Sequence, residues 1–507
     1  MPEEKPVGTE VQPELGDATA PVQPVHSSTT KSKTPLIVGV TIGVVVLAVV
    51  AAFAAKSMQK EDTQTTKDTK KDQQQTVKGG NPADANGLVS GDASLALECV
   101  PKGHDYYRTN DALTVDPKNA DVAYVGVEFK GVYKTSDGGA TWTLSDKGVR
   151  GYPSEQDASK KCIQEMGRII VDPQDNTHLL MSRVESPGDL STLFSENAGV
   201  YESKDSGATW AQLLKPGMNA SGSRAIAFDP KDSKTIYYGS NNMQPSFGIG
   251  GTHAITDYFN DKGILYKTTD GGATWAELPT GAEHGFRAMN VAVDPADSKK
   301  LWFFTFSATE DGSTPPEDAQ KGAMLSTDTG ATWKSFSSSM PTGYKQLVGG
   351  MLSPTNGKHA FVITGTTSGA PKSFATTDGG TTWVASNTYQ LVAAYDPNDA
   401  TGMRMLGYAP YNTTPAIMES KDGGVTWNTY ATLPANVNDS GKVGGVRISS
   451  FAWGTNNKNV VYMSGSASTV WKSTDNGKTW KSVMTLDTVG GKNKNKEGND
   501  ISRMPEQ

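Results

Sequence analysis

An eight-residue motif, S/T-x-D-x-G-x-T-W, recurs seven times along this chain and always ends in tryptophan. We call it the turn motif. Its copies are Thr135–Trp142, Ser203–Trp210, Thr268–Trp275, Ser326–Trp333, Thr376–Trp383, Ser420–Trp427 and Ser473–Trp480. A motif repeated at such intervals indicates a repeat architecture, in which one supersecondary unit is copied and stacked. The repeat constrains the fold far more than the function, because function must be argued from a site.

The residue types within the motif predict a tight turn between two strands. The aspartate accepts backbone N–H groups, the glycine permits a positive φ, and the tryptophan supplies an apolar ring for packing between sheets. We therefore expect structural roles for seven aspartates and seven tryptophans. They are Asp137, Asp205, Asp270, Asp328, Asp378, Asp422 and Asp475, and Trp142, Trp210, Trp275, Trp333, Trp383, Trp427 and Trp480.

A second signature precedes each copy: apolar residues, then Asp-Pro, then an apolar strand. The fifth unit has Ser353-Pro354 instead, and the seventh departs with Trp453-Gly454. Proline cannot continue a central strand, so this signature ends one strand and begins a turn. Each unit then has four strands, A to D, with strand D beginning at the tryptophan. The sequence predicts an all-β chain with a single seven-bladed β-propeller over residues 106–486. Residues 93–105 form a lead-in segment, within which 94–100 is a candidate edge strand.

The N-terminal part has a different composition. Residues 36–55 carry no charge and are long enough to cross a bilayer, which predicts one transmembrane helix over 35–56. A cleavable signal peptide is the alternative, although its apolar region is usually shorter. Lysines follow the segment as well as precede it, so the charge pattern leaves the orientation ambiguous. We expect disorder in the tail 1–34, the tether 57–92 and the tail 487–507.

Composition excludes some functions. The formal net charge of −7 argues against nucleic acid as a partner. The six histidines show no metal-ligand spacing, and no nucleophile or phosphate-binding motif is present, so we expect no metal, no cofactor and no catalytic residue from motifs alone. The two cysteines, Cys99 and Cys162, either form a disulfide or remain free thiols.

Propeller topology places the A–B turns and the turn motifs on one face, and the B–C and D–A connections on the other. Four connections on that second face are long: 183–198, 240–262, 306–322 and 144–167. An arginine lies near the start of strand A in five blades: Arg108, Arg168, Arg224, Arg287 and Arg447. Gln346 and Gln390 take that place in blades five and six. The arginines either bind a carboxylate or phosphate group at the channel mouth, or pair with loop acids such as Glu128, Glu165, Glu185 and Asp189.

The turn motif is that of the Asp box, or BNR repeat, and the chain resembles Asp-box β-propellers in all seven copies. It resembles the photosystem II stability/assembly factor family and, more loosely, the sortilin-type (VPS10) receptor domain. This resemblance implies an extracytoplasmic module, extracellular or periplasmic, that binds a protein or another ligand without chemistry, with the five arginines as candidate contacts.

Two alternatives follow from other Asp-box proteins. Sialidases and xyloglucanase-type enzymes are glycoside hydrolases, which need two carboxyl groups at a defined separation. The loop acids Glu185, Asp189, Asp257, Asp261 and Glu310 are candidates, but no motif selects a pair. The xyloglucanase type joins two propellers across a cleft, and one is predicted here. The other alternative is a carbohydrate-binding adhesion module that uses loop aromatics (Tyr152, Phe247, Tyr258, Phe259 and Tyr411).

Overall fold

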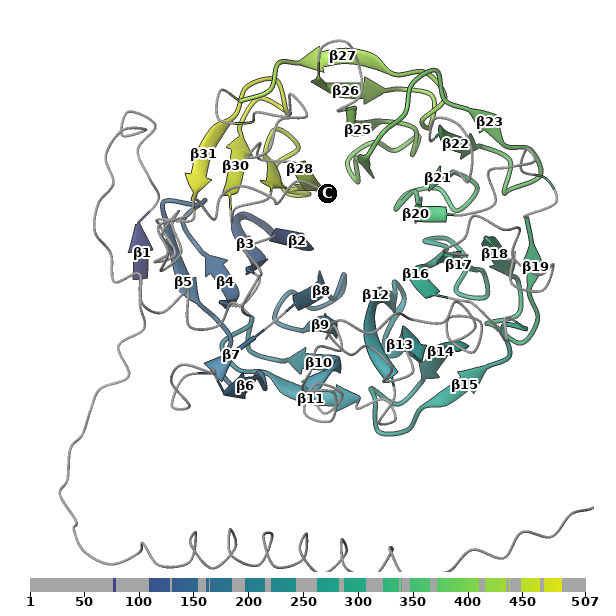
Figure 1. The fold of residues 1–507 in the computed structure, drawn as a ribbon, viewed down its shortest axis with the longest axis horizontal. Coiled ribbons are helices and arrows are strands. Elements are labelled where there is room, and N and C mark those ends of the chain that lie inside the picture. The colour runs from purple at the N-terminus through teal and green to yellow at the C-terminus, as the bar shows by residue number, and fades with distance from the viewer. Residues whose placement is uncertain are drawn as a thin grey trace, which may run out of the picture. The chain divides into compact units, whose positions relative to one another are not determined.

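The computed structural model describes residues 76–78, 109–127, 130–153, 161–163, 165–184, 197–214, 220–242, 262–281, 287–306, 322–336, 339, 347–364, 372–409, 415–434, 437, 448–465 and 469–485. All of them belong to one compact unit, Gln73–Gln507. Seven antiparallel sheets of this unit are arranged as blades around a common axis (Figure 1). The prediction of a seven-bladed all-β propeller with four-stranded blades is confirmed.

Each blade is built from four strands that are consecutive in sequence. Blade 1 contains β2 (Thr109–Asp116), β3 (Asn119–Val127), β4 (Gly131–Thr135) and β5 (Thr141–Leu144). Blade 2 contains β8 (Glu165–Val171), β9 (Leu179–Val184), β10 (Gly199–Ser203) and β11 (Ala211–Leu214). Blade 3 contains β12 (Ala220–Asp229), β13 (Asp232–Asn242), β14 (Lys262–Thr268) and β15 (Ala276–Leu278). Blade 4 contains β16 (Arg287–Val293), β17 (Leu301–Phe306), β18 (Ala323–Ser326) and β19 (Lys334–Ser335). Blade 5 contains β20 (Leu347–Leu352), β21 (Ala360–Thr364), β22 (Lys372–Thr376) and β23 (Val384–Ala385). Blade 6 contains β24 (Val392–Tyr395), β25 (Met405–Ala409), β26 (Ala416–Ser420) and β27 (Asn428–Ala431). Blade 7 contains β28 (Ile448–Trp453), β29 (Val461–Gly465), β30 (Thr469–Ser473) and β31 (Lys481–Met484).

Two findings differ from the sequence expectations. Strand D begins one residue after the tryptophan in six blades, and only β5 contains its tryptophan, Trp142. The tryptophan therefore belongs to the end of the turn, where the backbone has not yet joined the ladder. A short strand, β1 (Thr76–Lys78), pairs antiparallel with β5 as a fifth strand of blade 1. It lies in the segment expected to be a disordered tether, whereas the candidate edge strand 94–100 lies outside the described residues.

The core lies between the blades. Seven clusters of buried apolar side chains each join two neighbouring blades, one cluster for every junction. The cluster at the ring closure, for example, contains Val125 and Trp142 of blade 1 with Tyr462 and Val470 of blade 7. Stability therefore depends on stacking the sheets against each other, because a single blade cannot bury either of its faces alone.

The turn motif has the same hydrogen bonds in each blade. In blade 2 the Ser203 hydroxyl donates to Asp205 Oδ1 (2.8 Å) and accepts the Gly207 N–H (2.8 Å). Asp205 also accepts the N–H and the hydroxyl of Thr209 at 2.8 and 2.6 Å. These bonds satisfy the polar groups of the turn internally. The fourth residue of each copy donates its N–H to the A–B turn of its own blade, as Ser206 does to the Thr177 carbonyl, so both turns lie on one face. We call it the turn face.

The glycine at the fifth position of the motif has a positive φ in all seven copies. It also packs closely against the preceding blade. A Cβ atom on Gly380 would lie 2.7 Å from the Phe336 ring, and one on Gly330 would lie 2.5 Å from Leu278. The motif is thus both a turn and a contact between blades. The fourth residue of the motif also has a positive φ. It is glycine in four copies, and in the other three it is Ser206, Thr329 or Asn476 with φ near 60°.

No strand is shared across the ring closure in the described sheets. Side chains join blade 7 to blade 1 instead. The Trp142 indole donates to the Val483 carbonyl at 3.0 Å, and the Tyr462 hydroxyl donates to the Ala120 carbonyl at 3.1 Å. The Ala120 N–H donates to Asn456 Oδ1 at 2.8 Å. Blade 7, which lacks the Asp-Pro signature, is thus joined to blade 1 by side-chain hydrogen bonds.

Candidate functional site

The face opposite the turn face receives the B–C connections. They are long in three consecutive blades, where they span residues 185–198, 243–261 and 307–322. In blade 7 the same connection is residues 466–468. The strand ends therefore place the three long B–C connections where the sequence predicted them. The connection between β5 and β8 contains a small hairpin of its own, β6 (Tyr152–Pro153) and β7 (Lys161–Cys162).

The five arginines proposed for the channel mouth are described to different extents. Arg108 and Arg447 lie outside the described residues, and Arg224 and Arg287 lie in β12 and β16, where only their backbone is described. Arg168 lies in β8 of blade 2, and its side chain is partly buried.

Arg168 reaches across the inner strands to another blade. Its Nη1 donates to Asn290 Oδ1 of blade 4 at 2.5 Å, and Asn290 Nδ2 donates to the Gly350 carbonyl of blade 5 at 2.9 Å. Blade 3, between them, has the small Ala225 at the equivalent position of β12, four residues before Asp229. A hydrogen-bond chain thus links blades 2, 4 and 5 on the inner side of the ring. A guanidinium has five donors in a fixed plane, so this group is suited to a carboxylate or phosphate.

The glutamines expected beside the arginines do not extend that arrangement. Gln346 lies outside the described residues, and the Gln390 side chain is fully buried. Gln390 Oε1 lies where a Cβ on Gly407 would be placed, between neighbouring strands rather than at the mouth. Neither of its amide atoms has a hydrogen-bond partner among the described residues.

The aspartates of the turn motif are engaged as hydrogen-bond acceptors. Bonds from the Thr274 hydroxyl and N–H and from the Thr268 hydroxyl lower the pKa of Asp270 to about 2. Asp328 has the same environment, and its pKa is also lowered to about 2. Such carboxylates stay ionised and are poor proton donors at neutral pH, which suits them to holding the turn.

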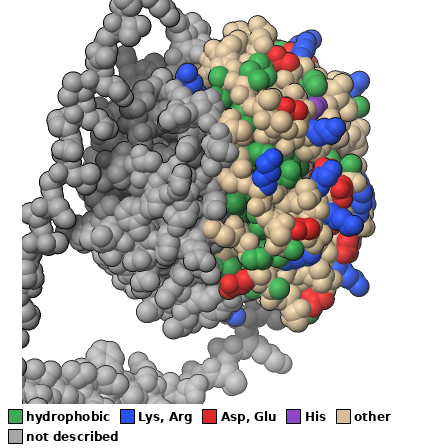
Figure 2. Space-filling view, turned by 90° about the vertical axis from the view of Figure 1, so that its right-hand side faces the viewer, with side chains coloured by type: hydrophobic (Ala, Val, Ile, Leu, Met, Phe, Trp, Pro, Cys, Tyr) green, Lys and Arg blue, Asp and Glu red, His purple; other side chains and the backbone are tan. Residues whose placement is uncertain are grey.

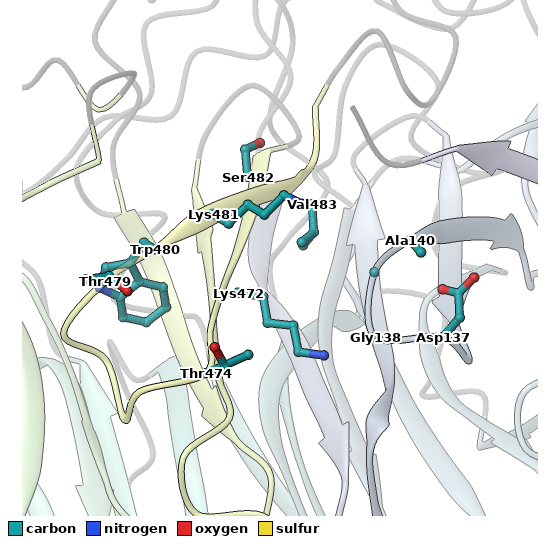
Figure 3. Close-up of a pocket in the computed structure, with 11 residues that line it drawn as sticks. Asp137, Gly138, Ala140, Lys472, Thr474, Thr479, Trp480, Lys481, Ser482 and Val483 are labelled. Carbon is teal, nitrogen blue, oxygen red and sulfur yellow. The ribbon is translucent and has the colours of Figure 1, made fainter. Parts of the chain in front are cut away.

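A groove of about 450 Å³ opens on the turn face between blades 7 and 1 (Figure 3). Lys472 and Val483 form one wall, and Gly138 and Ala140 form the other. The Lys472 ammonium lies 3.0 Å from Asp121 Oδ1 of blade 1, so it joins the two blades. In blades 2, 3 and 4 a larger side chain, Leu213, Leu278 or Phe336, packs against the motif glycine of the next blade. Blade 7 has the smaller Val483 at this position, and the groove lies beside it.

Two ionic clusters on the turn face were not singled out by the sequence. In blade 2, His178 lies between Asp172 and Glu202. In blade 6, Arg404 lies between Asp396, at 2.5 Å, and Glu419, at 2.8 Å. The signal that identifies them is the Glu-Ser-Lys-Asp form of the turn motif, which only blades 2 and 6 share. On the side of the propeller seen in Figure 2, acidic and basic side chains of the described residues are interspersed.

Among the described residues no group of three or more histidine, cysteine, aspartate or glutamate side chains is placed to hold a metal ion. No helix in the described part of the chain is long and apolar enough to cross a bilayer; residues 36–55 lie outside that part. Cys99 also lies outside it, and Cys162 ends β7.

Comparison with known proteins agrees with this architecture. The family model of sortilin (neurotensin receptor 3) matches residues 198–344. A xyloglucanase of a Paenibacillus species is 26% identical over 377 residues, which are 68% of this chain but 31% of that enzyme. The chain is thus a seven-bladed propeller with sequence similarity to the sortilin family model and to a xyloglucanase. It therefore spans about a third of the length of that curated relative.

Two solved structures are distantly similar to this chain. The GH74 xyloglucanase from Xanthomonas campestris is 16% identical with a TM-score of 0.38, covering 74% of this chain and 58% of that one. The structure of YCF48 bound to D1 peptide is also 16% identical, with a TM-score of 0.40 over 64% of this chain and 83% of that one. At this level of identity the likeness concerns the fold alone.

Proposed function

We propose that this chain is a membrane-anchored, extracytoplasmic propeller that binds a protein or another ligand without catalysing a reaction. The observation that carries the proposal is the grouping of long B–C connections on blades 2, 3 and 4. Long connections within a compact domain usually have a function. The three follow strands of adjacent blades, so we expect a ligand to contact more than one of them, and residues 36–55 would hold the propeller near a bilayer.

The inner strands supply a candidate contact beneath that surface. Arg168 of blade 2 and Asn290 of blade 4 belong to two of the three blades concerned. Because Asn290 fixes one guanidinium nitrogen, the plane of Arg168 is oriented in advance, which lowers the entropy lost when a ligand binds. A carboxylate or phosphate group is the chemistry that matches it. Arg108, Arg224, Arg287 and Arg447 would add to this contact.

A binding experiment tests this proposal with matched variants. Residues 243–261 are replaced by a short Gly-Ser connection, and residues 365–371 of blade 5 receive the same replacement as a control. Extracytoplasmic proteins captured by the immobilised full-length chain are then compared. We expect capture to be lost with the first replacement, weakened at least tenfold by Arg168→Ala, and unchanged by the control and by Lys358→Ala on the turn face. Loss of capture in Lys358→Ala but not in Arg168→Ala would contradict the proposal.

A glycoside hydrolase is the second candidate, favoured by the sequence match to a xyloglucanase over 377 residues. The acids proposed for it, including Glu185, Asp189 and Asp261, lie outside the described residues. Release of reducing ends from xyloglucan, other polysaccharides and sialosides distinguishes the two candidates. Release above a blank that disappears with Glu185→Gln or Asp261→Asn would establish a hydrolase. We expect no release on any of these substrates.

A further inference from the structure

His178 of blade 2 has a carboxylate at each ring nitrogen. Its Nδ1 lies 2.9 Å from Asp172 Oδ2 and its Nε2 lies 2.9 Å from Glu202 Oε1. Asp172 follows β8, His178 precedes β9 and Glu202 lies in β10. The Asp172 side chain is completely buried, and those of His178 and Glu202 are 12% and 10% exposed. One imidazole therefore joins three strands of the blade.

Both contacts require the doubly protonated ring. A neutral imidazole has one N–H, so it satisfies one carboxylate and turns a lone pair toward the other. The imidazolium donates to both. Burial by itself would lower the pKa of His178, but the hydrogen bonds and charges of Glu202 and Asp172 outweigh it, and the pKa is raised above its usual value of 6.5.

Blade 6 contains the same arrangement with a group that does not titrate. Arg404 replaces the histidine, Asp396 and Glu419 replace the two carboxylates, and Lys421 contacts Glu419 as Lys204 contacts Glu202. Arginine stays protonated at any pH at which proteins fold. The chain thus carries a permanent cation in blade 6 and a titratable one in blade 2.

We propose that His178 makes blade 2 responsive to pH: the imidazolium fastens the A–B turn to β10, and loss of its proton releases Glu202. The proton leaves Nε2 because Asp172 has no access to solvent and needs the Nδ1 donor. Glu202 keeps the Lys204 ammonium at 3.0 Å and can turn toward water.

The turn that contains His178 also contacts both neighbouring blades. Asp175 lies in the same turn, and its carboxylate accepts the Thr177 N–H and hydroxyl. From blade 1, the Lys118 ammonium donates to the Gln174 carbonyl of this turn at 2.9 Å. From blade 3, the Phe228 ring packs edge-on at 5.0 Å, and the following Asp229 is bound by Ser298 and Lys231. His178 therefore also contacts the junction with blade 3.

The sign of the effect follows from the direction of the pKa shift. A group whose pKa is higher in the folded state stabilises that state fully below the unfolded pKa, near 6.5, and loses its contribution as pH rises through the folded pKa. Within that window the folding equilibrium constant falls by up to about tenfold per pH unit. The blade that loosens is the one that carries Arg168 and the connection 185–198.

The experiment measures chemical unfolding of the full-length protein between pH 5.5 and 9. We expect the wild type to lose stability across the window above pH 6.5. His178→Arg, which gives blade 2 the cation of blade 6, should remove this loss of stability. The double variant His178→Arg, Arg404→His should show the loss again, because the titratable group then lies in blade 6. Equal pH dependence in the wild type and His178→Arg overturns the proposal.

A second measurement covers the case in which His178→Arg does not fold. Histidine-selective ¹³C labelling of the wild-type protein follows the titration of each imidazole, and Glu202→Gln identifies His178 by the resonance whose midpoint falls. A midpoint above 6.5 that falls in Glu202→Gln supports the proposal. A midpoint at or below 6.5 for every histidine overturns it.

Discussion

The strongest test of the turn motif as a contact between blades uses two adjacent glycines of blade 5. Gly379 and Gly380 have φ values of +76° and +86°. A Cβ atom on Gly379 would meet nothing within 4 Å, whereas one on Gly380 would lie 2.7 Å from the Phe336 ring of blade 4. Substituting each by alanine therefore separates backbone strain from packing.

The expected magnitudes differ for physical reasons. A left-handed conformation costs a non-glycine residue roughly 1–2 kcal/mol, and the reduced freedom of the unfolded chain returns about 0.4–1 kcal/mol. Gly379→Ala should therefore cost roughly 0–1.6 kcal/mol. Gly380→Ala adds overpacking of about 1–3 kcal/mol, because the Phe336 ring is held between Trp302 at 5.3 Å and Trp383 at 6.5 Å.

The assay is denaturant-induced unfolding of the two full-length variants, followed by tryptophan fluorescence. Gly271 and Gly272 of blade 3 provide a replicate, since a Cβ on Gly271 meets nothing and one on Gly272 would lie 2.5 Å from Leu213. We expect the second glycine of each pair to be the more sensitive by about 1–3 kcal/mol. Equal losses within both pairs would refute the role of this glycine in joining blades.

Three further predictions concern single groups. Trp142→Phe should cost about 1 kcal/mol more than Trp383→Phe in the free energy of unfolding, because the Trp142 indole donates to the Val483 carbonyl whereas the Trp383 indole has no partner among the described residues; equal costs would contradict this. Gln390→Met should raise the free energy of unfolding by about 1 kcal/mol, since two buried amide atoms lack partners among the described residues; a destabilised variant would show that the amide is satisfied. The pKa values of Asp270 and Asp328, near 2, mean that these carboxylates stabilise the fold above the unfolded pKa of 3.8 and stop doing so only as pH falls toward 2. Circular dichroism during acid titration should therefore show a shallower loss of structure between pH 3.8 and about 2 in Asp270→Asn than in the wild type, and an identical titration would contradict it.

The fold could be predicted from the sequence because the residues that form each turn lie within one short motif. Ser203, Asp205 and Thr209 satisfy each other within eight residues, so the turn does not depend on distant partners. The alternation of turns and apolar strands then determines the blades. The edge strand β1 was not predicted, because Thr76–Lys78 lies in a charged and polar segment without a strand pattern. Its strand conformation depends on pairing with β5.

The candidate site could be predicted only in part. The long connections were evident from the spacing of the motifs, and Arg168 was identified by its place in strand A. Its partner Asn290 is 122 residues away, so the pairing depends on the curvature of the ring, which sequence spacing does not encode. For the His178 cluster the Glu-Ser-Lys-Asp form of the motif marks Glu202 alone, because His178 and Asp172 become its neighbours only when β8, β9 and β10 form a sheet.

The departure of blade 7 from the Asp-Pro signature follows from how the ring closes. A Cβ atom on Gly454, which stands in place of the aspartate, would lie 2.4 Å from the Ala120 Cβ of blade 1. An aspartate there would collide with the first blade. Asn456 and Thr455 take over its role across the junction, by accepting the Ala120 N–H and donating to the Pro117 carbonyl. Because the described sheets share no strand at this junction, closure depends on such side-chain contacts, and the last repeat differs from the others where it meets the first.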